Sequence, residues 1–299
     1  MKKSIKYCSV FHQDASETVA YNNPLFPVYA EYSFLSSYPG YSCISHWHED
    51  LELILIKRGA MTYNVNGALV ELTEKCGILV NSRQLHYGFS AAHRECEFIC
   101  LLFSPELLAG NEWFYQNYVT CITENSSYPY LYLAPENWTA VILQKAEEFY
   151  ACFQNLPANP SSYFAAISVL TAILEQLYTH LDLSDQTRKA ENAELSSLRN
   201  MIAYMEEHYT EHITLANIAL AGACCKSRCA LLFKKYLRDT PISYATKLRL
   251  RKSLAALLDS DRTISDIACE YGFNGASYYC ETFKKYYGES PKMYKRRVR

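Results

Sequence analysis

The sequence predicts an α+β multidomain protein, with an N-terminal β-barrel, a helical segment after it and an all-α C-terminal domain. Its 299 residues are about two domains at the usual size of about 150 residues. The apolar pattern changes from short, strand-like runs to helical spacing after about residue 130. Residues 1–193 hold 11 Lys and Arg against 20 Asp and Glu, whereas residues 194–299 hold 18 against 11. An acidic body is therefore joined to a basic module, although the net charge is only −2.

Residues 29–105 contain short apolar runs separated by turn residues. Such runs predict an antiparallel sheet folded into a barrel or a sandwich. Asn66-Gly67 is typical of a two-residue hairpin turn. The predicted strands are 52–57, 61–65, 68–72, 77–80 and 97–103. We therefore assign residues 1–135 to a β-barrel domain.

Two predicted helices follow and make up a helical segment over residues 136–183. The first has apolar residues at helical spacing from Trp138 to Leu156 and ends at Pro157. The second has the a/d seam Tyr163, Ile167, Leu170, Leu174, Leu177 and Leu181, with Phe164, Ala166, Val169 and Ile173 beside it. Seams of this kind are used between paired helices. Because the helix is also apolar beside the seam, one face can pack on the barrel and another is left for a partner, so we expect this segment to form a homodimer. A helix packed wholly inside its own domain is the alternative.

Residues 184–193 are polar and aperiodic, which predicts a linker to a C-terminal domain over residues 194–299. The twelve cysteines contain no C-x2-C spacing, and we interpret them as reduced and mostly buried. The sequence shows neither an apolar run typical of a signal peptide nor a stretch of about 18 uncharged apolar residues. We therefore expect a cytoplasmic protein with no membrane partner.

The basic half repeats itself at about fifty residues. Thr214-Leu215 and Ile218-Ala219 recur as Thr263-Ile264 and Ile267-Ala268, and Phe233-Lys234-Lys235-Tyr236 recurs as Phe283-Lys284-Lys285-Tyr286. Two copies indicate a duplicated supersecondary unit. Each copy has a Thr-capped short helix, a turn and a second helix, which is the plan of a helix-turn-helix.

A helix predicted over residues 241–258 connects the two repeats. It would be about 27 Å long at 1.5 Å per residue, and successive major grooves on one face of DNA recur about every 34–36 Å. With its flanking turns it can hold two recognition helices in consecutive grooves. Arg249, Arg251 and Lys252 add positive charge along the connector. The lysines at the end of each second helix and the tail can contact phosphates, the tail through Lys292, Lys295, Arg296, Arg297 and Arg299. The expected partner is double-stranded DNA.

The second repeat, ISDIACEYGFNGASYYCETFKKYYGESPKMYKRR, resembles the C-terminal signature of AraC-type transcription regulators. The first repeat and the connector resemble the tandem helix-turn-helix arrangement of the same family. The resemblance implies a sequence-specific transcription regulator that binds promoter DNA with both repeats. It places base-reading positions at Ser227, Ala230 and Leu231 in the first repeat and at Ala276, Ser277, Cys280 and Glu281 in the second.

With the neighbouring lysines, the expected DNA-contacting residues are Lys226, Ser227, Ala230, Leu231, Ser277, Cys280, Glu281, Lys284 and Lys285. Ala230 and Leu231 can contact thymine methyl groups, and Glu281 can accept a hydrogen bond from cytosine N4 or pair with Lys285 instead. The chain departs from the family pattern at Leu231 and Glu281, where Arg is common. It departs again at Ala223, where Gly is usual, because Gly222 stands one residue earlier.

Residues 40–59, GYSCISHWHEDLELILIKRG, have the spacing G-x5-H-x-H-x3-E-x6-G, which resembles the first cupin motif. In a strand, His46 and His48 point to the same face because they are two residues apart, and Glu52 joins them if the strand is unbroken. His86 lies where the second cupin motif should be. The resemblance implies a cupin-like barrel with these four side chains converging inside it.

Three interpretations of the four residues are open. They can hold Fe, Mn, Ni or Zn. They can form a metal-free pocket that hydrogen-bonds a polar effector such as a sugar or a small acid, with Arg83, Tyr87, Tyr63 and Trp47 as neighbours. Alternatively, His46 and Glu49 lie on an exposed rim and cap a turn. The second interpretation fits a regulator best, so we assign His46, His48, Glu52 and His86 to effector binding and expect neither a metal nor another cofactor.

The sequence therefore predicts a non-enzymatic regulator. A cupin-like sensor binds a small-molecule effector, the helical segment forms a homodimer, and the tandem repeats bind promoter DNA; RNA polymerase is a further partner if the protein activates transcription. The alternative is a metal-dependent cupin enzyme, such as a dioxygenase or isomerase, or a metal sensor, fused to the DNA-binding domain.

Overall fold

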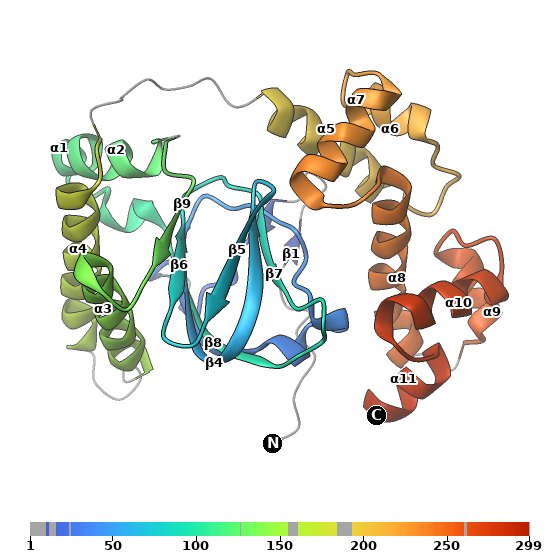
Figure 1. The fold of residues 1–299 in the computed structure, drawn as a ribbon, viewed down its shortest axis with the longest axis horizontal. Helices are drawn as coiled ribbons and strands as arrows, with labels where there is room; N and C mark the ends of the chain where they lie inside the picture. The colour runs from blue at the N-terminus through green and yellow to red at the C-terminus, as the bar shows by residue number, and fades with distance from the viewer. Residues whose placement is uncertain are drawn as a thin grey trace. The chain divides into compact units, whose positions relative to one another are not determined.

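The computed structural model describes residues 10–11, 16–23, 25–125, 127–154, 161–183, 193–259 and 262–298. The chain divides into two compact units. Residues 17–190 make up most of the N-terminal unit, and residues 191–299 most of the C-terminal unit. The first is rich in strands and the second is helical, which confirms the predicted α+β architecture (Figure 1). Most of the predicted linker, and the prolines Pro157 and Pro160, lie outside the described residues.

An antiparallel sheet of seven strands forms the centre of the N-terminal unit. The strands are β3 (Val28–Phe34), β4 (Leu51–Val65), β5 (Ala68–Thr73), β6 (Gly77–Val80), β7 (His86–Phe89), β8 (Cys96–Phe103) and β9 (Tyr130–Leu133). Their order is β3-β8-β4-β6-β9, and β5 and β7 pair with the distal half of β4. This agrees with the predicted cupin-like domain, except that the pairings among the described strands leave the sheet open instead of closing a barrel.

The strands predicted at 52–57 and 61–65 are one continuous strand, β4. Its register with β8 shifts between Ile56 and Arg58, and Gly59 follows with a φ of 83°. A Cβ at Gly59 would lie 2.5 Å from the carbonyl oxygen of Glu95, so this position requires glycine. The strand therefore bends without ending. Beyond it, Asn66-Gly67 forms the predicted two-residue turn into β5, with positive φ at both residues.

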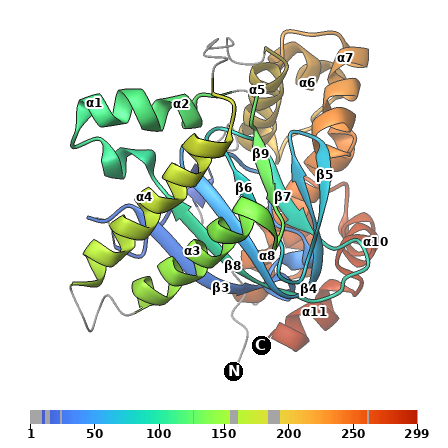
Figure 2. The same cartoon turned by 60° about the vertical axis from the view of Figure 1, so that its left-hand side comes forward.

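The sheet separates two apolar layers. Leu51, Leu53 and Leu55 of β4 point to the layer that contains the helices α3 (Asn137–Gln154) and α4 (Ser162–His180). Figure 2 shows these two helices side by side across the sheet. Ile54 and Ile56 belong to the other layer. Because side chains alternate along a strand, Glu52 lies on the Ile54 side, away from α3 and α4.

The apolar seam of α4 packs inside its own unit, so the expected homodimer would use another side of this helix. Leu170, Leu174 and Leu177 are buried in the cluster shared with α3, and Tyr163, Ile167 and Leu181 pack against the same cluster. The reason is that α3, its neighbour in the chain, contributes an apolar face to the same cluster, made of Ile142, Ala146, Phe149 and Phe153. Of the residues beside the seam, Ala166 and Ile173 are also buried, whereas Phe164 is 82% exposed.

Short elements complete the N-terminal unit. They are β1 (Val10–Phe11) with β2 (Glu17–Thr18), the 3-10 turns η1 (Leu35–Ser37), η2 (Pro39–Tyr41) and η3 (Pro105–Leu108), and α1 (Glu112–Phe114), the π-turn η4 (Tyr115–Val119) and α2 (Thr120–Thr123). β1 and β2 pair as a separate two-stranded sheet. This places Glu17, the first residue of β2, outside the main sheet.

The C-terminal unit contains the predicted pair of helix-turn-helix motifs. Its elements are α5 (Ala193–His208), α6 (Leu215–Ala221), α7 (Lys226–Leu232), the π-turn η5 (Phe233–Leu237), α8 (Pro241–Asp259), α9 (Ile264–Glu270), α10 (Ala276–Tyr287) and α11 (Pro291–Val298). Thr214 and Thr263 cap α6 and α9 through reciprocal capping boxes, as their position predicted. The connector is α8. Residues 291–298, treated as a tail in the sequence, form a helix, and Arg299 lies outside the described residues.

The two helix-turn-helix turns use different residues. In the second motif Gly272 takes the left-handed conformation, with a φ of 74°. In the first motif Ala223 takes it, with a φ of 50°, although alanine is disfavoured there. Gly222 is needed for a different reason, since a Cβ on it would lie 2.6 Å from Cγ of the buried Met201. Packing against α5 therefore explains the displaced glycine.

No single helix in the described part of the chain is both long and apolar enough to cross a membrane. Residues 215–221 and 226–237 reach that length and composition only when taken together, and they are bent by 80° relative to each other.

Candidate functional site

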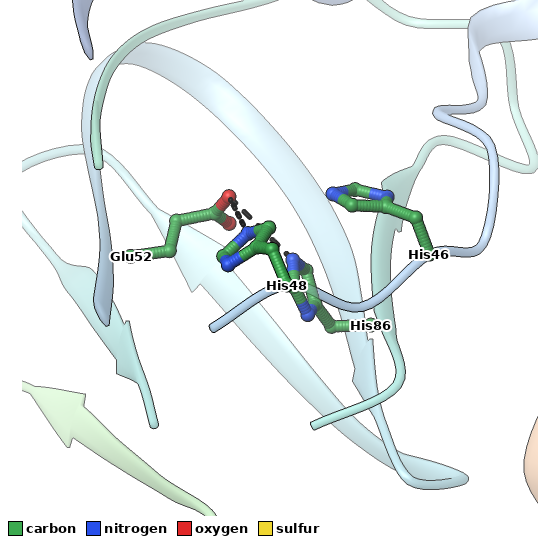
Figure 3. A group of neighbouring side chains, drawn as sticks. All are labelled: His46, His48, Glu52 and His86. Carbon is green, nitrogen blue, oxygen red and sulfur yellow. Dashed lines mark ion pairs between the residues drawn. The ribbon is translucent and has the colours of Figure 1, made fainter. Parts of the chain in front are cut away.

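The structure brings together the four residues that the sequence assigned to effector binding. His46, His48, Glu52 and His86 point toward one another, and one ligand atom from each lies within 4.8 Å of those of the others (Figure 3). The side chains of His48, Glu52 and His86 are 1–4% exposed, and that of His46 is 12% exposed. The group is therefore a largely buried cluster of polar side chains.

Three separate segments supply the cluster. Glu52 is the second residue of β4, and His86 is the first residue of β7. His46 lies before β4 and forms an isolated antiparallel bridge with His86, with N–H to carbonyl oxygen distances of 3.1 and 2.9 Å. A bend at residues 49–50 separates His48 from β4. The strand is therefore broken between His46 and Glu52. Glu52 still joins the histidines, because the bend and the bridge bring the side chains together.

A backbone carbonyl orients each imidazole. The Nδ1 atoms of His46, His48 and His86 lie 2.7, 3.1 and 2.7 Å from the carbonyl oxygens of Ile44, Asp50 and Gln84. Because a carbonyl oxygen only accepts hydrogen bonds, Nδ1 carries the proton in each ring. In the neutral ring, Nε2 is then left with a free lone pair. Histidines that bind metals are oriented in this way.

Glu52 is the acidic centre of the cluster. Its Oε2 lies 3.4 Å from Nε2 of His48 and 3.5 Å from Nε2 of His86, and both nitrogens are buried without a hydrogen-bond partner. Its Oε1 accepts a hydrogen bond from the hydroxyl of Tyr63. Nε2 of His46 instead faces Oε2 of Glu17 at 3.1 Å.

Burial and charge act in opposite directions on these groups. Burial lowers the pKa of His46 to about 4, although the Glu17 carboxylate opposes this shift. Burial alone would lower the pKa of His48, but the facing Glu52 carboxylate raises it above its usual value. Burial alone would raise the pKa of Glu52, yet His86 and His48 hold it well below its usual range. Glu52 is therefore a carboxylate. Burial and Glu52 raise the pKa of Tyr63, so its hydroxyl keeps its proton and donates a hydrogen bond to Glu52.

Some neighbours of the cluster were foreseen and others were not. Tyr63, expected near the site, contacts Glu52 directly. Arg83, also expected there, points away and pairs with Glu49 at 2.6 Å, and both side chains are about 60% exposed. The third interpretation, in which His46 and Glu49 lie on an exposed rim, therefore fits Glu49 and does not fit His46. Sequence reasoning missed Glu17, because no spacing pattern links it to His46.

The first recognition helix, α7, is buried on one side and exposed on the other. Cys229 and Leu232 are buried. Lys226, Ser227 and Leu231 are exposed, and Ala230 is half-buried. The residues expected to contact DNA are therefore on the accessible side. Arg228, which sequence reasoning did not select, lies beside them with 45% of its side chain exposed.

The second recognition helix, α10, is arranged in the same way. Tyr279, Phe283 and Tyr287 are buried. The expected contact residues Ser277, Glu281, Lys284 and Lys285 are exposed, and Ala276 and Cys280 are half-buried. Each helix-turn-helix thus presents a polar and basic surface that a DNA groove can reach.

Known families match both units of the chain. Residues 223–297 match the family described as helix-turn-helix domain. Residues 29–201, more than half of the chain, match the AraC-like ligand binding domain. The chain belongs to the AraC family of transcription regulators. An AraC-family regulator has a ligand-binding domain and a helix-turn-helix DNA-binding domain, which confirms the function predicted from the sequence.

Relatives of this AraC-family chain extend over most of its length. The HTH-type transcriptional regulator YdeC of Bacillus subtilis (strain 168) is 28% identical over 84% of this chain and 85% of its own. The HTH-type transcriptional activator RhaS of Mannheimia succiniciproducens is 23% identical over 83% of this chain and 87% of its own. Among solved structures, ToxT from Vibrio cholerae O395 is 14% identical with a TM-score of 0.42, and covers 91% of this chain and 98% of its own.

Proposed function

We propose that this AraC-family regulator binds its effector at His46, His48, Glu52 and His86, and that binding changes how its helix-turn-helix motifs engage promoter DNA. The observation that supports this site is the approach of two buried Nε2 atoms, those of His48 and His86, to the Glu52 carboxylate, neither of them with a hydrogen-bond partner. Leaving a buried polar atom unsatisfied costs about 1–3 kcal/mol. A polar ligand that satisfies these atoms therefore gains binding free energy from the folded state.

A divalent transition-metal ion is the second candidate for the effector. Two ligand atoms that each lie about 2.0–2.2 Å from one ion are about 3.0–3.5 Å apart at the usual angles between ligands. The separations of Glu52 Oε2 from the Nε2 atoms of His48 and His86, 3.4 and 3.5 Å, fall in this range. The donor set suits Zn, Ni, Mn or Fe, and the carbonyl bonds to Nδ1 would orient the rings toward the ion. A bound ion would supply a Lewis-acidic anchor for an anionic small molecule.

Thermal unfolding of the full-length protein tests both candidates. A ligand of the native state raises the melting temperature, by the equivalent of about 2.7 kcal/mol at a hundred times its Kd. Separate titrations with Zn²⁺, Ni²⁺ and Mn²⁺, and with a panel of sugars and small acids, identify the class. We expect the shift to disappear in the His48→Ala/His86→Ala double variant and to persist in His93→Ala, which alters an exposed histidine of the same unit.

The outcomes separate the candidates. A shift with a metal alone supports the metal sensor, and a shift with a metabolite in chelated buffer supports the metal-free site. A shift that survives in the double variant, or no shift with either class, contradicts the proposed site. Tryptophan fluorescence of the double variant shows whether it is folded, since Trp47, Trp113 and Trp138 all lie in the N-terminal unit.

We propose that DNA is contacted by Lys226, Ser227, Ala230 and Leu231 on α7 and by Ser277, Cys280, Glu281, Lys284 and Lys285 on α10. Their place on the accessible sides of the two recognition helices supports this. Lys284 and Lys285 are exposed in the last turn of α10, where they can reach phosphates. Binding of the full chain to its own promoter region and to random duplex, measured at about 50 and about 200 mM salt, separates sequence readout from phosphate contact.

We also propose that the chain acts as a homodimer through the outer side of the helical segment 136–183. Because the seam of α4 is internal, the support comes from Phe164 and Tyr178, which are 82% and 44% exposed on that helix. Sedimentation velocity at several concentrations tests this. A Phe164→Ser variant that dimerises as strongly as the unmodified protein contradicts the assigned surface.

The remaining partners follow from the regulatory role. If the chain activates transcription, as the name of its relative RhaS states for that protein, RNA polymerase is a further partner. Since the relatives are named as transcription regulators, we infer that the chain is not an enzyme. We place it in the cytoplasm because it has to reach promoter DNA.

A further inference from the structure

One carboxylate at the start of the C-terminal unit binds three donors from the first recognition helix and the turn that follows it. Oε1 of Glu194 accepts a hydrogen bond from Nη2 of Arg228. Its Oε2 accepts from Nζ of Lys235 at 2.5 Å and from the hydroxyl of Tyr236 at 2.6 Å. We call Glu194, Arg228 and Lys235 the α5–α7 charge cluster.

The two cations of this cluster lie at one edge of the surface assigned to DNA. Arg228 follows Ser227, and Lys235 follows the exposed Lys234. Their side chains are 45% and 53% exposed, whereas Cys229 and Leu232 face the core. When a recognition helix lies in the major groove, its edges face the phosphates along the groove walls. Arg228 and Lys235 are therefore placed where phosphates approach.

We propose that Glu194 occupies the place of a DNA phosphate in the free protein, and that phosphate oxygens replace it on Arg228 and Lys235 when the regulator binds. Carboxylate and phosphate oxygens both accept charge-assisted hydrogen bonds from guanidinium and ammonium groups. Glu194 is thus a positioning residue, and Arg228 and Lys235 are phosphate-contacting residues beyond those assigned above. The proposal rests on the DNA-binding function and not on the effector site.

The energetics favour exchange of one anion for the other. Ion pairs between partly exposed groups are weak, so a phosphate can displace the carboxylate. Hydrogen bonds from Lys235 and Tyr236 lower the pKa of Glu194 to about 2, so the carboxylate stays charged at neutral pH. The Glu194 carboxylate therefore competes with DNA phosphates for Arg228 and Lys235 at neutral pH, and its negative charge repels a phosphate nearby. Removing that charge should strengthen binding to any sequence.

Fluorescence anisotropy of the full-length protein on random-sequence duplex, over a series of salt concentrations, tests the proposal. Glu194→Gln keeps the shape of the side chain and should raise the affinity about 3- to 10-fold at low salt. Arg228→Gln/Lys235→Gln should lower the affinity and reduce the slope of log K against log salt by about 2, since each phosphate contact contributes about 0.9. In that double-variant background, Glu194→Gln should have no further effect.

Glu207→Gln is the matched control, because it removes one carboxylate of the same helix that is 59% exposed and outside the cluster. An equal gain in DNA affinity in this control would mean that the effect is one of bulk charge, which overturns the proposal. The same holds if Glu194→Gln still raises the affinity when Arg228 and Lys235 are replaced. Unchanged or weaker binding of Glu194→Gln also overturns the proposal. If Glu194→Gln loses helical circular dichroism, the Lys235→Gln variant is used instead. An unchanged slope of log K against log salt in Lys235→Gln then excludes a phosphate contact by Lys235. Unmodified protein that binds no duplex contradicts the DNA-binding function itself.

Discussion

The left-handed alanine in the first helix-turn-helix turn can be tested by replacing it with glycine. Ala223 has a φ of 50°, where the equivalent Gly272 has a φ of 74°. A left-handed conformation costs an L-residue about 1–2 kcal/mol. Glycine removes that strain but adds freedom to the unfolded chain, which costs about 0.4–1 kcal/mol. Ala223→Gly should therefore stabilise the C-terminal unit by about 0.5–1 kcal/mol.

The reverse substitution in the second turn should be much more damaging. A Cβ at Gly272 would lie 2.7 Å from the carbonyl oxygen of Thr210 and 2.8 Å from that of Tyr209. Backbone atoms cannot rotate away as the end of a side chain can, so the clash adds to the conformational strain. Gly272→Ala should destabilise the C-terminal unit by more than about 2 kcal/mol.

Urea unfolding with two probes measures these changes. Because Trp47, Trp113 and Trp138 all lie in the N-terminal unit, tryptophan fluorescence reports that unit, while far-ultraviolet circular dichroism also follows the helices of the C-terminal unit. We expect the circular dichroism midpoint to rise in Ala223→Gly and the fluorescence midpoint to stay the same. The control is Ala221→Gly at the end of α6, which should lower stability. Equal or lower stability of Ala223→Gly relative to the unmodified protein would refute the reasoning.

Other predictions concern DNA binding and the buried cluster. Lys284→Ala should weaken binding to promoter and random duplex alike and lower the salt slope by about 0.9, whereas Leu231→Ala should alter sequence preference. Anisotropy titrations at several salt concentrations measure both, and equal, salt-insensitive binding of the two variants would count against the assignment. Tyr63→Phe removes the phenol donor to buried Glu52 and should cost about 1–3 kcal/mol in urea unfolding followed by tryptophan fluorescence; an unchanged midpoint would mean that this hydrogen bond adds nothing. Burial lowers the pKa of His46 to about 4 from 6.5, so the unfolded chain takes up this proton first as the pH falls. The free energy of unfolding of the N-terminal unit should therefore fall by up to about 3 kcal/mol between pH 6.5 and pH 4. The His46→Gln variant should lose less stability over the same pH range. A pH profile identical to that of the unmodified protein would show that His46 is not the group responsible.

Local patterns predicted those parts of the fold that depend on neighbouring residues. The Asn66-Gly67 turn, the threonine caps and the connector α8 are set by conformational preferences within a few residues, and the structure has all three. The strand break expected between residues 57 and 61 is wrong, because the register shift at Lys57 and the left-handed Gly59 bend β4 against β8 without ending it. A glycine can end a strand or bend it, and the partner strand determines which occurs.

Features that depend on distant partners were less predictable. The seam of α4 shows which face of the helix is apolar, but the same pattern suits a helix of a second chain and α3 of its own chain. In the buried cluster, the motif spacing selected all four residues, whereas Glu17 next to His46 follows only from the fold. Arg228 was missed for a similar reason, since its partner Glu194 lies 34 residues earlier.

The backbone bridge between His46 and His86 limits what the cluster can accept. Reciprocal peptide hydrogen bonds join the two residues, and their ring centroids are 4.4 Å apart. These bonds fix the separation of the two backbones, so the imidazoles can move apart only by rotation of their side chains. For the effector site proposed above, only a small group fits between the two rings without such a rotation.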